Sequence, residues 1–191
     1  MAEINLRDIL NAGQFYVAEL SEKLGIEIKA VKHEIATNTC FEKADLLGWE
    51  PERIVKAIFF HRDDDVYGFV FPELGKECPL KIDIKEVLPR VINISRKQAK
   101  SFKNSYCPEG MEYGTCTPFV FEDEFNKANG LEKIFIHDIP EINQKLIDIS
   151  IGGFGERAHK TSLHLNYEGI YQILNYKFGD AIIKTNLFDN I

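Results

Sequence analysis

Two strand-like runs, residues 54–61 and 66–71, constrain this chain most, because a break of four charged residues, Arg62 to Asp65, separates them. Runs rich in Val, Ile and Phe on either side of a short polar break predict an antiparallel β-hairpin. Aspartate side chains favour turns through local hydrogen bonds, so we interpret the three consecutive aspartates of the break as turn residues rather than as a metal cluster. The fold is therefore expected to be built on a sheet.

Lys56 lies in the middle of the first run, on the side that Ile54, Ile58 and Phe60 share, because side chains alternate across a strand. Removing an ammonium from water without a partner costs roughly several kcal/mol. Either an anion meets Lys56 in the fold, or this face of the strand is not fully buried. The alternative interpretation is an edge-strand lysine that blocks aggregation.

Composition sets the size of the folding unit. A chain of 191 residues, 45% of them hydrophobic, can bury a sizeable core within one domain. We expect residues 1–191 to form a single domain, with residues 1–14 as an N-terminal helical extension. The start of the chain is polar, and no apolar run approaches the length of a membrane span, so a cytoplasmic protein without a membrane partner is expected.

The net charge of −7 excludes a global basic field that would attract nucleic acid or anionic membranes. Residues 81–103 nevertheless carry a local net charge of +5, which includes Arg96, Lys97 and Lys100. Such a stretch is either a solvated helix face or a patch that meets a phosphate backbone.

The cysteines argue against a zinc site and against a disulfide framework, because they form no C-x2-C pair. They lie at Cys40, Cys78, Cys107 and Cys116. Reduced thiols in a cytosolic compartment fit this pattern best. We expect neither a metal nor a cofactor.

Helices and short strands are predicted in an irregular order. Apolar spacing predicts helices within residues 4–24, divided at Gly13 and ended by Gly25, and a capping box with a closing glycine predicts a helix from Thr39 to Gly48. A third helix is expected to begin near Asn166, with Glu168 in its first turn. Residues 84–103 are expected to be mainly helical, broken at Pro89, with a short strand at 91–94. Further strands are expected at residues 26–35, 119–121, 133–137, 146–151, 162–165 and 181–184. This order predicts an α+β or mixed α/β fold with one sheet surrounded by helices.

The segment Gly114-Thr115-Cys116-Thr117-Pro118 is a second candidate site. Glycine allows close backbone approach and proline fixes φ, so such a loop can aim its intervening amides and carbonyls at a ligand. The pattern is common by chance, and a second copy occurs at residues 75–79. Its context differs from that copy, because Gly110 precedes it and the apolar residues 119–121 follow it.

The order of these features resembles the free-standing aminoacyl-tRNA deacylases of the YbaK/ProX type, which also occur as the editing domain of bacterial prolyl-tRNA synthetases. The resemblance spans roughly residues 15–175. The matching pieces are Gly25-Ile26 with the strand through His33, the Thr39–Gly48 helix, Pro51 to Lys56 entering a strand, Gly110 with Gly114-x-x-x-Pro118-Phe119, Ile134 to Asp138, and Ser150-Ile151-Gly152.

The resemblance implies a partly barrel-like mixed sheet and hydrolysis of the ester that joins a wrong amino acid to a tRNA, with a prolyl-type tRNA and a prolyl-tRNA synthetase as partners. It implies that Lys56 holds the acceptor end through phosphate. It also implies that the backbone from Gly114 to Pro118 frames the aminoacyl group. Water or a ribose hydroxyl of the substrate is the implied nucleophile, without a metal.

Further roles follow from the same resemblance. Thr115, Cys116 and Thr117 lie within the framing loop, and Ser150 and Gly152 match the pocket wall. His159 matches a histidine of the synthetase-borne version only loosely, so it is either a pocket residue or part of a solvated loop. The basic residues Arg96, Lys97 and Lys100 are expected to contact acceptor-stem phosphates.

Three departures leave room for other readings. Glu109 stands where a threonine is expected beside Gly110, residues 122–133 resemble an insertion, and residues 152–161 differ from the family pattern. A module that binds a nucleotide or aminoacyl group without hydrolysing it is therefore the rival, and an unrelated α+β protein is the third possibility. Cys116 as a nucleophile is disfavoured, because no activating partner is visible in the sequence.

Overall fold

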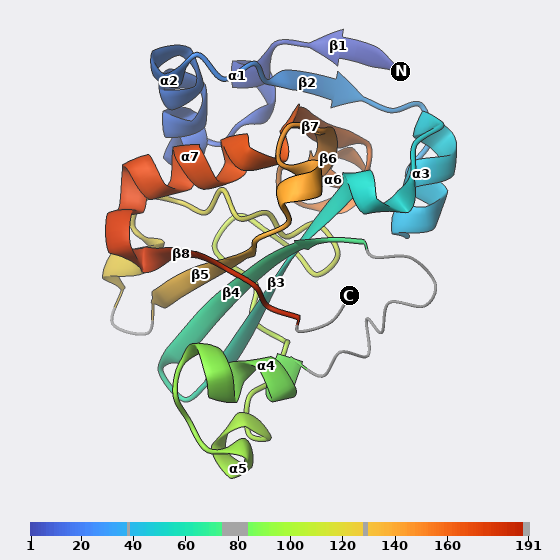
Figure 1. Cartoon of the computed structure of the whole chain (residues 1–191). Helices are drawn as coiled ribbons and strands as arrows, with labels where there is room; N and C mark the ends of the chain where they lie inside the picture. Colours follow the sequence, from blue (N-terminus) through green and yellow to red (C-terminus); the bar gives the residue numbers. More distant parts are fainter. Residues whose placement is uncertain (38, 74–83, 128–129, 189–191) are drawn as a thin grey trace.

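One mixed sheet organises the chain, and its strands follow the order β1-β2-β7-β6-β3-β4-β5-β8 (Figure 1). A computed structural model describes residues 1–37, 39–73, 84–127 and 130–188. The strands within these ranges are β1 Ala2–Ile4, β2 Lys29–Lys32, β3 Ile54–Arg62, β4 Asp65–Pro72, β5 Leu131–His137, β6 Leu146–Ser150, β7 Thr161–Asn166 and β8 Ile182–Thr185. The helices are α1 Leu6–Ile9, α2 Phe15–Leu24, α3 Cys40–Leu47, α4 Ile84–Val91, α5 Arg96–Ala99, α6 Gly155–His159 and α7 Tyr167–Phe178. The expected fold class, a single mixed sheet surrounded by helices, is confirmed.

The predicted hairpin is confirmed as β3 and β4, which pair antiparallel along their whole length. Asp63 adopts a left-handed φ of 51°, which Asp tolerates better than most residues. The Arg62 guanidinium donates to Asp65 Oδ2 at 2.7 Å across the turn. These residues therefore act as turn residues.

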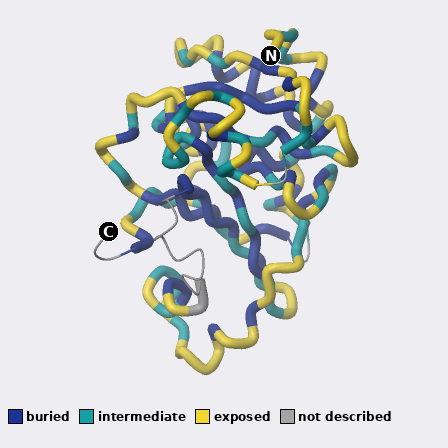
Figure 2. The backbone as a smooth tube through the Cα atoms, turned by 90° about the vertical axis from the view of Figure 1, so that its right-hand side faces the viewer, coloured by how far each residue is buried: buried dark blue, intermediate teal, exposed yellow. Residues whose placement is uncertain are grey.

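The two faces of this hairpin supply two apolar clusters. Phe59 and Val70 point into the larger cluster with α2 and α7, while Phe60, Phe69 and Phe71 point into a smaller one with α4. Figure 2 shows the buried residues along the central strands and the exposed residues towards the periphery. The hairpin is thus a central layer of the molecule, because apolar groups cover both of its faces.

Strand β3 pairs with β6 over a very short length. The parallel register joins only Ile54 to Asp148 and Val55 to Ile149. Beyond Val55, no described strand pairs with this edge of β3 before an isolated bridge between His61 and Lys103. The sheet therefore opens between β3 and β6, beginning at Lys56.

Helix ends agree with the local sequence signals. Thr39 Oγ1 accepts from the Glu42 amide at 3.1 Å, and Glu42 accepts from the Thr39 amide at 3.2 Å, which confirms the capping box. Gly48 and Gly25 end α3 and α2 in left-handed conformations, with φ of 66° and 67°.

Several predicted boundaries are wrong, for identifiable reasons. Residues 119–121 form no strand, because Gln14 and Tyr16 side chains satisfy the carbonyls of Phe119 and Val120 at 2.7 and 3.1 Å. Residues 91–94 form no strand either, since Asn93 has a left-handed φ of 54°.

Other differences concern Pro89 and the N-terminus. Pro89 lies inside α4 without ending it, because burial of Val87 and Leu88 in the smaller cluster offsets one missing hydrogen bond. The extension expected to be helical begins instead with β1, which pairs with β2.

Strand β2 is shorter than predicted. The second G-x-x-x-P copy, residues 75–79, lies outside the described residues. No helix in the described ranges is long and apolar enough to cross a membrane.

Candidate active site

A cavity of about 540 Å³ occupies the opening between β3 and β6. Its walls come from β3, α3, the segment 104–116, β6 and α6. Six of the predicted site residues line it: Lys56, Gly114, Thr115, Cys116, Ser150 and His159. Its volume is in the usual range for small-molecule sites. The early parting of β3 from β6 therefore brings the strand lysine and the glycine-rich loop to one cavity.

Lys56 meets an anion, as the strand pattern requires. Its ammonium forms an ion pair with Glu73, which follows β4. The Glu73 side chain is 1% exposed, whereas that of Lys56 is 24% exposed. Both conditions inferred from the sequence hold, because Lys56 has a counter-ion and still faces the cavity. The edge-strand interpretation does not fit this position, because β3 lies between β6 and β4 in the sheet and Lys56 is paired with a buried carboxylate.

Side-chain and backbone hydrogen bonds hold the glycine-rich loop. Gly114 has a left-handed φ of 92°, a conformation that favours glycine. Thr115 Oγ1 donates to the Gly153 carbonyl at 2.9 Å, and Ser150 Oγ donates to the Thr115 carbonyl at 2.7 Å. The Gly153 amide donates to the Gly110 carbonyl at 2.9 Å. The loop is thus fastened to the segment that follows β6, which fixes its backbone at the cavity wall.

Other predicted residues lie behind this wall. Thr117, Pro118 and Gly152 are not among the residues that line the cavity. Thr117 is fully buried, and a Cβ at Gly152 would lie 2.9 Å from Met111 Cγ. Their positions support the loop from behind rather than face a ligand.

His159 belongs to α6 and does line the cavity. Its Nε2 lies 3.6 Å from Glu112 Oε1. Of the two interpretations left open by the sequence, the pocket residue agrees with this position.

The predicted RNA-binding residues lie elsewhere. Arg96 and Lys97 belong to α5, Lys100 follows it, and all three are exposed. In Figure 1, α5 lies at the lower end of the molecule, away from α3 and α6. The chain returns from α5 to the cavity through Asn104 and Tyr106, which line it.

The cysteine thiols near the cavity are poor nucleophiles. Burial and, to a smaller extent, the neighbouring Cys107 raise the pKa of Cys116 to about 12. Burial also raises the pKa of Cys40 to about 11, although the nearby Lys56 opposes this shift. Because the thiolate is the reactive form, these shifts agree with the rejection of Cys116 as a nucleophile.

The apparent insertion at residues 122–133 braces the entrance to the loop. Buried Glu124 accepts from the Tyr106 hydroxyl at 2.9 Å and from the Glu109 amide at 2.7 Å. Lys127 bridges Glu109 and Glu124 at 2.6 and 3.0 Å. Burial and the Glu124 hydrogen bond raise the pKa of Tyr106 to about 12. Glu109, which departs from the family pattern, therefore contributes to this brace.

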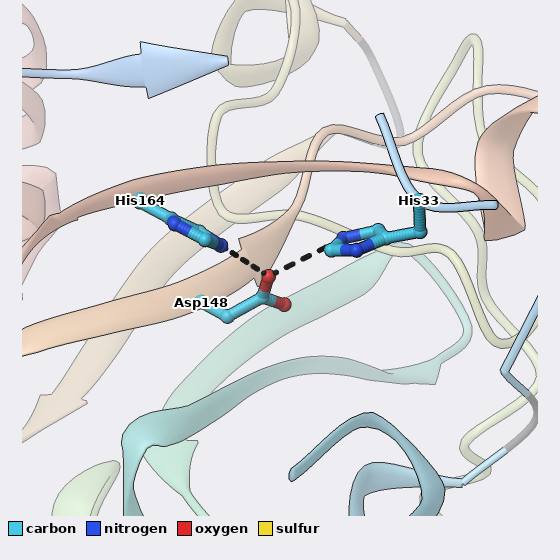
Figure 3. A group of neighbouring side chains, drawn as sticks. All are labelled: His33, Asp148 and His164. Carbon is cyan, nitrogen blue, oxygen red and sulfur yellow. Dashed lines mark hydrogen bonds and ion pairs between the residues drawn. The ribbon is translucent and has the colours of Figure 1, made fainter. Parts of the chain in front are cut away.

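A buried polar cluster adjoins the cavity at Asp148, His33 and His164 (Figure 3). Burial alone would raise the pKa of the Asp148 carboxyl, but hydrogen bonds from His164 and Ser162, the nearby His33 and the charge of Lys43 hold it well below its ordinary range. Potential ligand atoms of the two histidines and the aspartate lie within 4.8 Å of one another. These are the described residues that could hold a metal ion.

Sequence reasoning missed Glu73 and Asp148 as cavity residues. Glu73 follows β4 at the start of an undescribed segment, and no pattern in the sequence links it to Lys56. Asp148 interrupts an apolar strand, Leu146–Ser150, and this interruption is the signal that could have identified it. A carboxylate in a buried strand requires donors, and here the neighbouring strand β7 supplies two of them.

Comparison with known proteins gives similarity in structure only. No family model matches the sequence, and no curated protein matches it. A crystal structure of a protein proposed as a trans-editing enzyme for prolyl-tRNA synthetase has a TM-score of 0.59 at 14% identity, covering 95% of this chain and 99% of that one.

Two further structures have the same kind of likeness. A crystal structure of a hypothetical protein has a TM-score of 0.52 at 18% identity, covering 90% of this chain and 97% of that one. A scaffold from a study of computationally grafted epitope backbones has a TM-score of 0.55 at 11% identity, covering 95% of this chain and all of that one. At these identities the likeness establishes the fold alone: a mixed α/β architecture with one sheet, shared with a protein proposed as a trans-editing enzyme.

Proposed function

We propose that this protein hydrolyses the ester bond between a wrong amino acid and the terminal ribose of a tRNA, acting on mischarged tRNA in trans. The observation that carries the proposal is the convergence of Lys56 and the Gly114–Cys116 backbone on one cavity, although they are far apart in the sequence. The fold shared with a proposed trans-editing enzyme supports it. A prolyl-type tRNA that carries a small amino acid is the proposed substrate.

The chemistry demands little from side chains. Water attacks the ester carbonyl, the bond to the ribose oxygen breaks, and that oxygen takes the proton that the water gives up. Attack by a ribose hydroxyl alone would only move the ester to another ribose oxygen, so the role of that hydroxyl in hydrolysis is to hold and orient the water. An ester that is held in the correct orientation beside fixed dipoles reacts without a strong base or a covalent enzyme intermediate. Lys56 attracts the terminal phosphate, and the loop around Gly114 frames the aminoacyl group.

Such a hydrolase compensates for the limited ability of a synthetase to discriminate between similar amino acids by binding. One methylene contributes only about 1–3 kcal/mol to discrimination, so binding to a synthetase cannot strongly reject a smaller amino acid. A second cavity that hydrolyses whatever enters it restores accuracy.

The test is release of amino acid from a panel of mischarged tRNAs that includes prolyl-type tRNAs. Lys56→Ala should slow release at least about hundredfold, the scale of losing one stabilising donor. Lys29→Ala is the matched control, because Lys29 is an exposed strand lysine outside the cavity. Unchanged turnover in folded Lys56→Ala refutes the assignment. Retention of aminoacyl-tRNA without release identifies the non-catalytic binding module instead.

A further inference from the structure

Two carboxylates line the cavity among the described residues, Glu73 and Asp148. An ionised carboxylate only accepts hydrogen bonds, and its two oxygens offer about four acceptor positions. In a buried position each unused oxygen is costly, because water no longer solvates it. The two carboxylates differ in how many of these positions the protein itself occupies.

The protein already occupies both oxygens of Asp148. Its Oδ2 accepts from Ser162 Oγ and from His164 Nε2 at 3.0 Å, and His33 Nε2 lies 3.7 Å away (Figure 3). Its Oδ1 lies 3.7 Å from Lys43 Nζ. Asp148 therefore has its hydrogen bonds on Oδ2 and a cation close to Oδ1, so that both of its oxygens already face positive or donor groups of the protein.

Glu73 is different. Its Oε2 receives the Lys56 ammonium, but its Oε1 is buried and has no hydrogen-bond partner among the described residues. A buried acceptor without a donor destabilises a protein by about 1–3 kcal/mol, and by more if it is charged. A ligand that brings a donor to this oxygen would remove that cost. The matching donor is a cationic N–H group, because hydrogen bonds between charged groups are the stronger ones.

The proposed substrate carries such a group. An aminoacyl ester has a free α-ammonium on the carbon next to the reacting carbonyl, and a phosphate lies on the other side of the ribose. Lys56 and Glu73 present a positive and a negative group side by side in the cavity. The substrate presents the complementary pair, so that each charge meets its opposite.

We propose that Glu73 Oε1 binds the α-ammonium of the aminoacyl group while Lys56 faces the phosphate, an assignment that rests on the proposed function of the same cavity. Anchoring the ammonium fixes the adjacent carbonyl against the loop at Gly114. Esters whose amino group is acylated, such as formylated or peptidyl esters, lose this contact. The cavity thus selects tRNA that carries a single free amino acid.

The experiment compares release from one tRNA in two forms: charged with the amino acid that the wild-type protein removes fastest, and the same molecule N-acetylated. Relative to the spontaneous hydrolysis of each ester, wild type should accelerate the free-amine form at least about tenfold more, the scale of one charge-assisted hydrogen bond. Glu73→Gln should slow the free-amine reaction and leave the N-acetyl reaction nearly unchanged, so that the ratio of the two accelerations falls towards one. Glu132→Gln is the control, because Glu132 is exposed on β5 and outside the cavity.

Each outcome of this experiment bears on either the role of Glu73 or the proposed function. Equal acceleration of both forms by wild type, relative to their spontaneous hydrolysis, overturns this assignment alone and leaves the proposed function standing. Full discrimination by folded Glu73→Gln overturns it too. Release of neither form overturns the proposed function and the assignment with it. Because the substrate comparison uses the wild-type protein, the test survives even if Glu73→Gln fails to fold.

Discussion

Replacing Lys56 by Met should destabilise the protein, because the buried carboxylate of Glu73 then loses its counter-ion while the volume of the side chain is nearly kept. Removing one partner of a buried ion pair costs about 3–5 kcal/mol. The Lys56 side chain is 24% exposed, so water in the cavity screens part of the charge, and we expect a loss near the lower end, about 3 kcal/mol. For a chain of this length that loss lowers Tm by about 6–12 °C.

The partner variant makes the reasoning testable. Glu73→Gln leaves Lys56 facing the cavity and should cost less, about 1–2 kcal/mol. The double variant Lys56→Met/Glu73→Gln buries no charge at this position, so it should be more stable than Lys56→Met alone by at least about 1 kcal/mol. Urea unfolding followed by the fluorescence of Trp49, the only tryptophan, measures all three variants. Lys29→Met serves as the control.

Additive losses in the double variant would refute the ion pair as the source of the effect. The same three variants also serve as controls for the activity test on Lys56, because they distinguish loss of the fold from loss of the reaction. A single variant that unfolds cannot report on catalysis. A double variant that stays folded and inactive would assign the loss of activity to the missing ammonium or carboxylate.

Three further outcomes follow from the structure. The pKa of Asp148 is lowered in the fold, so its stabilising contribution is present above its unfolded pKa, about 3.9, and is lost as pH falls towards the lower folded value. In urea unfolding between about pH 2 and 7, Asp148→Asn should therefore be less stable than wild type near neutrality and lose less stability on acidification. Gly114→Ala should slow amino-acid release and cost about 1–3 kcal/mol of stability, because its φ of 92° disfavours a side chain; wild-type rates would contradict this. Charge reversal at Arg96, Lys97 and Lys100 should weaken tRNA binding and flatten its dependence on salt, whereas unchanged binding at every salt concentration would mark this stretch as solvated surface.

Local signals in the sequence predict local structure well. The hairpin, the capped α3 and the glycine ends of α2 and α3 follow from residues close together in the chain. The segment 119–121 shows the limit, because apolar residues with strand character are buried there by side chains from α2 and its preceding turn. Tertiary hydrogen bonds satisfied that backbone instead of a neighbouring strand.

The same distinction between local and long-range signals applies to the candidate site. Alternation along the strand predicts that Lys56 needs an anion, but only the folded chain identifies Glu73 as that anion. The loop around Gly114 is recognisable from its glycine and proline, whereas its attachment to Gly153 depends on long-range packing. The short pairing between β3 and β6, which opens the cavity, has no local signal at all.

The brevity of the β3–β6 pairing has a consequence for how this architecture can change. The opening of the cavity begins where the β3–β6 pairing stops, after Val55. Its width therefore depends on how far the two backbones pair rather than on the size of a single side chain. One more residue pair between the strands would draw Lys56 against β6 and narrow the cavity. One residue pair fewer would widen it. Relatives with this topology could thus acquire new substrate preferences by lengthening or shortening the β3–β6 pairing, with every residue of the cavity wall left in place.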